Sequence, residues 1–348
     1  MCLLFLFREF PFYISMRFLI FIRKKAIIQQ GIRYRNVFKR LILIFSLTCL
    51  IGNSVKAQYD PSYSHYWPME PSFNPATVGK DNKLNVVGAY ALDFAGYEHN
   101  PNTFYVGADM PIYFMKQYHG VGISILNDKL GAFVHQRVAG QYAFRKDLWG
   151  GMLSAGVQVG MLFEKLDGSK LDPEEGSDPA LTQGEVNGHG LDLGVGVYYT
   201  HKNWYVGGSV QHLNAPLVDL GETNELPINR TYYLTGGYNI KLRNPFLTMP
   251  TSVLARYDGV KYRADITARL VYTHEKKVLY GGVSYSPTNS VTAMIGGTFH
   301  GINLGYSYEM YTGTAAFKNG SHGLFVSYQT DINLQKKGRN KHKSVRFL

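Results

Sequence analysis

Several stretches of this chain alternate, residue by residue, between apolar side chains and glycine or polar side chains. The stretches LSAGVQVGM (residues 153–161), LDLGVGVY (191–198) and ADITARLVY (264–272) follow this pattern. Because successive side chains of a strand point to opposite faces of a sheet, each stretch predicts a strand with one apolar face. An apolar face backed by a glycine-rich, polar face is typical of a membrane barrel, whose outside meets lipid and whose inside lines a lumen. A soluble β-sandwich also alternates, but we expect it to carry fewer glycines and fewer aromatic residues at its strand ends.

Fourteen candidate strands lie between turn-forming residues. They span residues 84–93, 102–109, 118–126, 132–144, 149–165, 188–200, 204–212, 230–240, 247–257, 262–274, 278–285, 291–298, 302–310 and 321–330. A bacterial single-chain barrel requires an even number of strands, and a tilted strand needs about 9–11 residues to span a bilayer. Residues 58–348 contain no apolar run long enough to predict a membrane helix. The predicted fold is therefore all-β, a transmembrane antiparallel β-barrel of about 14 strands.

The lengths and charges of the connections support this count. If the amino terminus of the mature chain is periplasmic, every long connection, such as residues 166–187 and 213–229, faces outward, and the longest periplasmic turn is residues 110–117. Long outer loops and short periplasmic turns are expected of such barrels. The outward loops are mainly acidic, whereas the periplasmic turns carry mainly Lys and Arg. Either these charges are only solvated loop ends, or the basic face docks an acidic partner.

Residues 1–57 have the features of a leader with a cleaved signal peptide. An apolar run at residues 41–51 follows a Lys-Arg pair and ends in a small-x-small site at Ala57, directly before Gln58. This run is too short for a membrane helix, which needs about 20 residues. We interpret the charged and apolar residues upstream as a misassigned start, with initiation at Val37.

Cysteine occurs only in this leader, at Cys2 and Cys49. Residues 58–348 therefore hold no disulfide and no thiol site. Lipid attachment at Cys49 is disfavoured, because Thr48 precedes it where a small residue is expected and the apolar run continues past it.

The net charge of +11 arises at the two ends of the chain. Ten of the 36 Lys and Arg residues and one of the 25 acidic residues lie in residues 1–57, and six basic residues lie in the acid-free tail 335–348. Residues 58–334 thus carry 20 basic and 24 acidic side chains, which excludes a basic body that binds nucleic acid. The tail is a candidate partner-binding segment. Its basic residues are Lys336, Lys337, Arg339, Lys341, Lys343 and Arg346.

Between the leader and the barrel lies an aromatic and proline-rich segment, residues 58–83, which we expect to be periplasmic. Pro61, Pro68 and Pro71 separate its Tyr, Trp and Phe residues and prevent a helix or a central strand. The segment ends in a turn into the barrel, formed by Asn74, Pro75 and Gly79. It either folds into the lumen as a hatch or packs as a strap under the barrel rim. The barrel then occupies residues 84–334, and residues 335–348 form a basic periplasmic tail.

Polar positions on the predicted inner faces are candidate lumen residues. They are Gln158, Asp192, Arg256, Asp265 and Arg269. Opposite charges inside a barrel either pair across strands and brace the wall, or form a selectivity ring if they lie at the same height.

No intact catalytic or nucleotide-binding motif occurs in the sequence. The Gly79-Lys80 pair lacks the spacing of a phosphate-binding loop, and Val278 stands where the second His of a zinc-protease motif beginning at His274 would be. The other histidines are scattered over predicted strand ends and turns. There is no Gly-x-Ser-x-Gly elbow. We therefore expect no enzyme activity, no cofactor and no metal site.

Fragments across residues 58–330 resemble one known family. They are the segment ending in Asn74-Pro75-Ala76-x-x-Gly79, then GVGISILNDKLG (120–131), GQYAFR (140–145), WYVGGSVQHLN (204–214), RTYYLTGGY (230–238), ITARLVY (266–272) and LGYSYEMYTG (304–313). In this order they resemble the PorP/SprF family of the type IX secretion and gliding machinery. The resemblance implies an outer-membrane barrel of a Gram-negative bacterium, with no catalytic residues. Its partners would be membrane lipid, periplasmic and outer-membrane components of the machinery, and a secreted or surface-adhesin client.

Three functions follow as hypotheses. The first is a non-enzymatic component of this machinery that supports export or surface attachment of large secreted proteins. Its basic turns and tail would anchor periplasmic partners, and loops 166–187 and 213–229 would recognise the client. The second is an outer-membrane channel for small hydrophobic or polar solutes, since fold alone does not decide function. The third, an outer-membrane hydrolase, is disfavoured by the missing catalytic residues.

Overall fold

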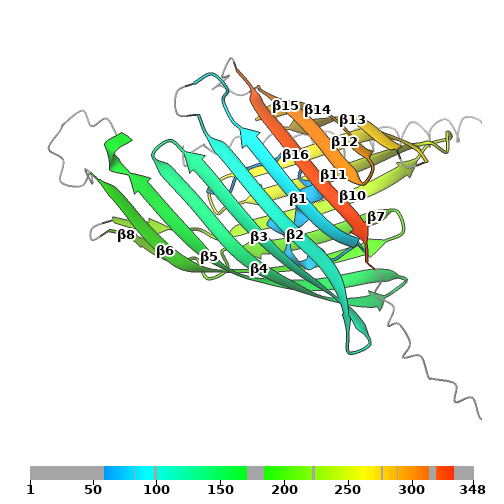
Figure 1. Cartoon of the computed structure of the whole chain (residues 1–348), viewed down its shortest axis with the longest axis horizontal. Helices are drawn as coiled ribbons and strands as arrows, with labels where there is room; N and C mark the ends of the chain where they lie inside the picture. Colours follow the sequence, from blue (N-terminus) through cyan, green and yellow to red (C-terminus); the bar gives the residue numbers. More distant parts are fainter. Residues whose placement is uncertain are drawn as a thin grey trace, which may run out of the picture. The chain divides into compact units, whose positions relative to one another are not determined.

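The structure is a computed structural model that describes residues 59–81, 83–97, 100–170, 184–221, 224–275, 277–287, 289–312 and 319–332. Fourteen antiparallel strands of this part of the chain pair in sequence order, and β1 pairs with β16 to close the barrel (Figure 1). The barrel strands are β1 (Lys83–Leu92), β2 (Asn102–Phe114), β3 (Gln117–Leu130), β4 (Phe133–Leu148), β5 (Gly151–Asp167), β6 (Glu185–His201), β7 (Trp204–Gln211), β10 (Thr231–Lys241), β11 (Leu247–Tyr257), β12 (Tyr262–His274), β13 (Lys277–Ser286), β14 (Ser290–Phe299), β15 (Ile302–Tyr311) and β16 (Ser321–Asp331). The predicted all-β barrel of fourteen strands is confirmed.

Several strands extend further toward the short turns than the sequence predicted. The predicted connection 110–117 is wrong, because β2 and β3 pair up to a two-residue turn at Met115 and Lys116. A proline usually ends a central strand, but Pro111 lies inside β2 opposite Gly120. Both turn residues have positive φ, 49° and 61°, as in the tight turns that match the twist of a hairpin. β4 likewise continues through the predicted turn to Leu148.

Connections of different length separate to the two ends of the barrel. One end, called the turn end, carries short connections such as residues 115–116, 149–150 and 202–203. The other, called the loop end, carries the long connections, including residues 212–230 between β7 and β10. That connection contains an unpredicted hairpin, β8 (Leu217–Leu220) and β9 (Asn224–Pro227).

The hairpin rests on the inner face of β6. A Cβ at Gly188 would lie 2.6 Å from Val218 of the hairpin, so glycine is needed there for the close approach. Val218 and Ile228 are buried and pack on Leu162 of β5 and on Tyr59. The connection 212–230 therefore covers part of the loop end.

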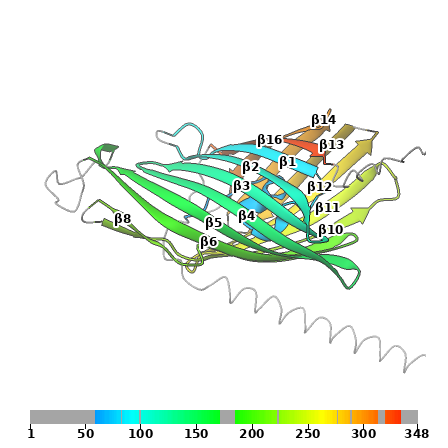
Figure 2. The ribbon, with the colours of Figure 1, turned by 60° about the horizontal axis from the view of Figure 1, so that its bottom comes forward.

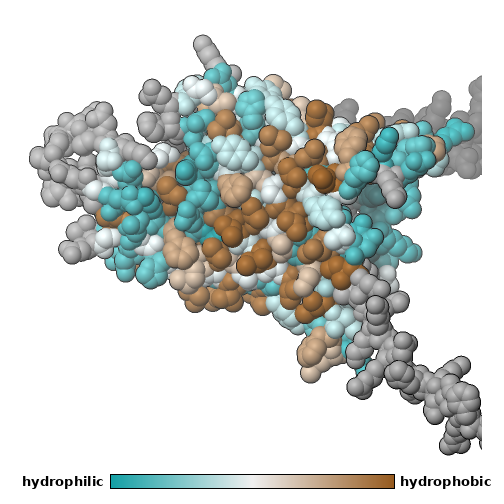
Figure 3. All heavy atoms as spheres, in the orientation of Figure 1, coloured by the Kyte–Doolittle hydropathy of each residue, from teal (hydrophilic) through white to brown (hydrophobic). Residues whose placement is uncertain are grey.

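Large apolar side chains face outward along the strands. On β5, Val157 and Val159 are 49% and 55% exposed. Gln158, which lies between them, and Ser154 on the same inward face are buried. On the face seen in Figure 3, apolar groups gather across the middle and hydrophilic groups lie toward either side. Aromatic side chains flank this band on its outer face, for example Trp149 and Trp204 at the turn end and Tyr257 and Tyr285 at the loop end. An apolar outer band between aromatic girdles is the surface of a barrel that spans a membrane.

None of the helices in the described part of the chain combines the length and apolar character that crossing a membrane requires.

Candidate functional site in the barrel lumen

Residues 59–81, called the plug, lie inside the barrel (Figures 1 and 2, blue). Tyr59 bonds to Glu164 near the loop end of β5, and Gly79 bonds to Asp109 near the turn end of β2. Between these points, two side chains reach the plug from opposite walls. Arg137 of β4 donates to the Ser72 carbonyl group, and Ser252 of β11 shares a hydrogen bond with the Tyr66 hydroxyl. A segment below the rim could not contact both walls. The segment expected to be periplasmic thus lies in the lumen, as in the hatch alternative.

Prolines give the plug its local conformation. They confine it to two short 3₁₀ helices, η1 (Trp67–Ser72) and η2 (Pro75–Thr77), and Asn74 caps η2 by accepting from the Ala76 amide at 3.0 Å. A chain without a helix or ladder leaves backbone carbonyl groups in need of donors, and buried carbonyl groups are almost always paired. The barrel wall supplies those donors.

Four inward side chains of the wall donate to three consecutive plug carbonyl groups at mid-lumen. The contacts are Gln141 to Pro71 (2.5 Å), Arg137 to Ser72 (3.0 Å), and Ser209 and Gln211 to Phe73 (2.6 and 2.8 Å). Gln158 links two of these donors, since it accepts from Gln141 at 2.7 Å and donates to Gln211 at 2.8 Å. Gln158 therefore bridges two of the side chains that hold the plug and does not line an open channel.

Glycines on the inner wall let the Asn74–Gly79 turn press against the strands. A Cβ at Gly196 would lie 2.1 Å from Asn74 Oδ1, one at Gly156 2.3 Å from the Ala76 amide nitrogen, and one at Gly120 1.9 Å from the Val78 carbonyl oxygen. Real Cβ atoms essentially never come so close. These three strands thus have no side chain where the plug backbone touches them.

A second anchor holds the last residues of the plug at the turn end. Asp109 accepts from the Gly79 amide at 2.8 Å, and Arg145 donates to the carbonyl groups of Gly79 and Lys80. Gly79 has φ of 63°, which favours glycine. Lys80 pairs with the buried Glu70 of η1; burial opposes the charge on Lys80, but this pairing outweighs it and raises the Lys80 pKa. The turn residues Asn74, Pro75 and Gly79 all lie at the plug–wall contact.

A charged cluster holds the other end of the plug, around Asp60. Its carboxylate lies 3.2 Å from Nε2 of His212 and accepts from the Tyr233 hydroxyl at 2.8 Å. Nδ1 of His212 lies 2.8 Å from Asp192, so both ring nitrogens face carboxylate oxygens and both carry protons. Burial tends to raise the pKa of Asp60, but the charges of His212 and Arg137 and the Tyr233 bond hold it well below its usual range.

The five predicted lumen residues all face inward, and four of them, Gln158 described above and three more, touch the plug or its anchors directly. Arg256 donates to the Asp60 carbonyl group at 2.7 Å, and the Arg269 guanidinium lies 3.8 Å from the centre of the Trp67 ring. Asp192 pairs with His212 and lies 4.0 Å from Arg137. Asp265 instead pairs with Arg263 on its own strand at 3.0 Å. The charges are arranged in separate contacts with the plug and the wall.

Several anchors were missed from the sequence. Arg137, Gln141 and Arg145 are four residues apart on β4 and all face inward. That spacing of polar residues on one face of a strand was the available signal. Asp60 gave no comparable signal, because it lies outside the predicted strands, and His212 was only the last position of the predicted strand 204–212, which ends at Gln211 in the structure. The predicted basic residues of the tail, 336–346, and the leader, 1–57, lie outside the described residues.

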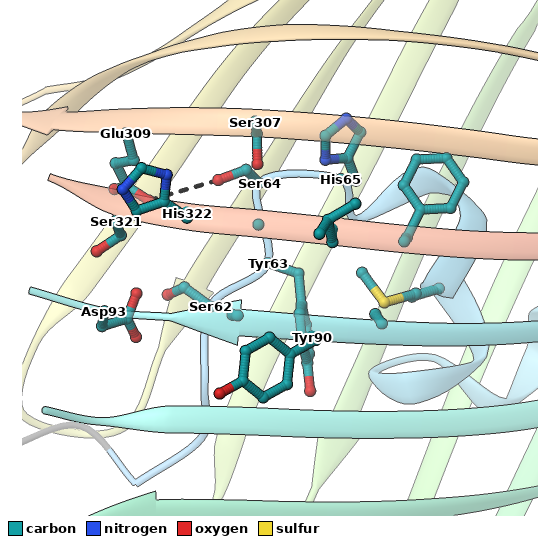
Figure 4. Close-up of a pocket in the computed structure, with 16 residues that line it drawn as sticks. Ser62, Tyr63, Ser64, His65, Tyr90, Asp93, Ser307, Glu309, Ser321 and His322 are labelled. Atoms are coloured by element: carbon teal, nitrogen blue, oxygen red, sulfur yellow. Dashed lines mark hydrogen bonds between the residues drawn. The ribbon is translucent and has the colours of Figure 1, made fainter. Parts of the chain in front are cut away.

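Three described cavities beside the plug are small. One cavity of about 20 Å³ lies between the plug and strands β1, β15 and β16, where Ser64 faces Glu309 and where Asp93 and Ser307 form part of the lining (Figure 4). Two others have volumes of about 40 and 10 Å³. A water molecule needs at least about 10–15 Å³, so these cavities admit one to a few waters.

Asp93, at the loop end beyond β1, gives the protein a testable pH dependence. Burial raises its pKa to about 6 from 3.8, and the nearby Glu309 and Asp128 add to this although Ser321 and Arg263 oppose it. Between about pH 4 and 6 the folded protein holds a proton that the unfolded chain has lost, so this carboxyl group destabilises the fold as pH rises. We expect the thermal midpoint of wild type in detergent, relative to that of Asp93→Asn, to be higher at pH 5 than at pH 7.5, because the buried carboxyl group is charged at the higher pH.

Circular dichroism melts at both pH values provide this comparison. Asp147→Asn, a change at an exposed carboxylate of the turn end, is the matched control. An equal difference between wild type and Asp93→Asn at the two pH values would contradict the assignment.

Most of the chain matches one family model, and several solved structures are similar to it at low identity. A family model described as type IX secretion system membrane protein PorP/SprF matches residues 55–328. Among solved structures, the Ralstonia pickettii toluene transporter TbuX is similar, with 12% identity and a TM-score of 0.47 over 76% of this chain and 94% of that one. A Pseudomonas aeruginosa FadL homologue has 13% identity and a TM-score of 0.44 over 75% and 93%. The search among curated proteins finds no match. The family match spans the plug and nearly the whole barrel, and the chain therefore belongs to the PorP/SprF family of type IX secretion system outer-membrane proteins.

Proposed function

We propose that this protein is a non-enzymatic outer-membrane component of the type IX secretion machinery that supports export or surface attachment of a large secreted protein while its own lumen stays closed. The observation that carries the proposal is the plug, which wall side chains hold at mid-lumen, at the turn end and at the loop end. Cavities of about 10–40 Å³ beside it are far too small for a protein chain. The client would therefore use a surface of the barrel.

The loop end is the surface we assign to the client. The connection 212–230 is fixed in position by its buried Val218 and Ile228, yet Leu213 and Leu217 are 37% and 53% exposed beside acidic Asp219 and Glu225. A rigid hairpin that presents apolar side chains next to charges has the composition of a recognition surface. Loop 166–187 lies at the same end, and its residues 171–183 are outside the described part of the chain.

The turn end is the surface we assign to periplasmic partners. It carries Lys116, Lys146, Lys202, Lys241 and Arg243, all of them outside or at the ends of the strands. Short turns of outer-membrane barrels face the periplasm. Basic groups on one face attract acidic partners and speed their association.

Deleting the gene tests the proposed role directly. We expect one or a few large secreted or surface proteins to be lost from the cell surface and the medium, because the client loses its outer-membrane support. Quantitative proteomics of surface and medium fractions measures this, with complementation as the control. The solute-channel alternative predicts the opposite result, in which the surface proteome is intact and uptake of a small solute is impaired.

Removing residues 335–348 tests the proposed role of the tail. We expect weaker co-purification of periplasmic components, and we expect added salt to weaken the wild-type association toward the level of the variant, because charge attraction is screened over about 10 Å at 0.1 M salt. The matched control keeps the tail length and replaces its six basic residues by Gln. If both variants retain their partners at low salt, the tail does not dock them.

A further inference from the structure

The outer wall of the barrel contains an apolar hollow away from the loop end. Its volume is about 620 Å³, and residues of β12–β15 form most of its lining. Leu270, Leu279, Ile295 and Leu304 stand around it, each between 45% and 62% exposed.

Glycines create the recess. Gly281 of β13 and Gly297 of β14 occupy outward positions in its floor, next to Leu279 and Ile295 in the ladder. A side chain at Gly297 would meet the Val278 carbonyl oxygen at 2.6 Å, so this position accepts only glycine without a shift of backbone. At Gly281 the nearest atom would be 3.9 Å away, which leaves room for a side chain where the hollow now lies.

The lumen side of the same wall is closed. Tyr280 faces inward, and its hydroxyl oxygen would lie 2.3 Å from a Cβ at Gly296 and 2.4 Å from one at Gly305. The ring therefore covers both glycines from inside, and His65 and Trp67 of the plug pack against it. Whatever occupies the hollow comes from the membrane.

A cation stands at the turn-end rim of the hollow. Lys277 is exposed, and it lies on the outward face of β13 in line with Leu279 and Gly281. Four residues of strand separate Lys277 from Gly281, or about 13 Å. One leaflet provides about 15 Å of hydrocarbon, so an acyl chain with its headgroup at Lys277 reaches the floor. His274 lies opposite Lys277 and stacks with Tyr272 on the same rim.

We propose that this hollow is a binding site for one phospholipid of the periplasmic leaflet, with an acyl chain over Gly281 and Gly297 and the phosphate group beside Lys277. An apolar floor with a lysine at its headgroup-level edge matches this ligand. A strand from another protein would need an unpaired edge, and β13, β14 and β15 are hydrogen-bonded on both sides within the barrel.

Photo-crosslinking tests the site. The full-length protein in lipid nanodiscs is irradiated with phosphatidylglycerol that carries a diazirine on one acyl chain, and labelled peptides are mapped by mass spectrometry. We expect labelling to concentrate on the peptides that contain Leu270, Leu279, Ile295 and Leu304. Gly281→Leu should reduce this labelling by roughly tenfold, because its side chain takes the place of several buried methylene groups.

Two comparisons complete the experiment. Gly140→Leu on β4, another outward glycine with open space around it, should leave the labelling unchanged. Lys277→Gln should reduce labelling by phosphatidylglycerol about fivefold, but not labelling by a diacylglycerol with the same diazirine chain. Uniform labelling around the barrel, or labelling that Gly281→Leu leaves intact, would overturn the proposal. Crosslinks to a protein in native membranes, in place of lipid, would also overturn it.

Discussion

Replacing Gly156 by leucine is expected to drive the plug out of its seat and convert a closed barrel into a conducting one. A Cβ at this position would lie 2.3 Å from the Ala76 amide nitrogen and 2.4 Å from the Pro75 carbonyl carbon. Both atoms belong to backbone, which cannot rotate away as a side chain can. Overpacking by methylene groups in a core usually costs about 1–3 kcal/mol, and a leucine against backbone costs more.

Planar bilayers measure the result. Wild-type protein should give no steady conductance, and Gly156→Leu should give open-channel currents in most insertions. Cysteine labelling reports the plug itself, because residues 58–348 contain no cysteine. Ser72→Cys, a near-isosteric change at a buried plug position, should resist a membrane-impermeant maleimide in wild type and react in Gly156→Leu.

The outward glycine of the adjacent strand provides the control. Gly140→Leu should leave conductance and labelling at wild-type levels, since a Cβ there would have 4.0 Å of clearance. A Gly156→Leu protein that stays closed and unlabelled would show that the plug does not depend on contact with β5.

Removing the charge of Arg137 is expected to cause the largest loss of stability of any single change at the lumen anchors. Arg137 is 5% exposed, donates to the Ser72 carbonyl group at 3.0 Å, and lies 4.0 Å from Asp192. In Arg137→Met, the buried Asp60 and Asp192 would lose one of the cations that offset their charges, and His212 would remain beside them. Breaking a buried charge pair by removing one partner typically costs about 3–5 kcal/mol.

A double-mutant cycle separates charge balance from lost packing. Asp192→Asn in the Arg137→Met background should restore part of the free energy of unfolding, because the uncompensated carboxylate is gone. Urea unfolding of the refolded protein in detergent or lipid vesicles measures all four members of the cycle. If the two changes are additive, the buried charges do not interact and the electrostatic account of this anchor fails.

Strand alternation explains why much of the barrel could be predicted. Positions such as Gln158 and Asp192 were assigned to the lumen because a period of two places every second residue on one face, and both are buried on the inner wall. The same reasoning found fourteen strands. It misplaced the β2–β3 turn, since Pro111 is accommodated inside a strand that it would usually end.

The plug contacts could not be predicted in the same way. Asn74 donates to the carbonyl group of Val197, which is 123 residues away, and no local pattern links the two. The glycines that receive the plug look like those of any lumen face, because their role appears only when Pro75 and Ala76 are placed against Gly156. The β8–β9 hairpin was missed because its four-residue strands carry too few alternations to be recognised.

The close fit of the plug has a consequence for how we expect this barrel to assemble. The first described residue of the plug, Tyr59, lies near the loop end, and the last, Asp81, lies beside the start of β1 at the turn end. Its bulky Trp67 and Phe73 lie among wall side chains that leave room only for waters, so the segment cannot be threaded through a finished barrel. We therefore expect the β1–β16 seam to close after the plug is in place, so that the sheet wraps around its own amino-terminal segment.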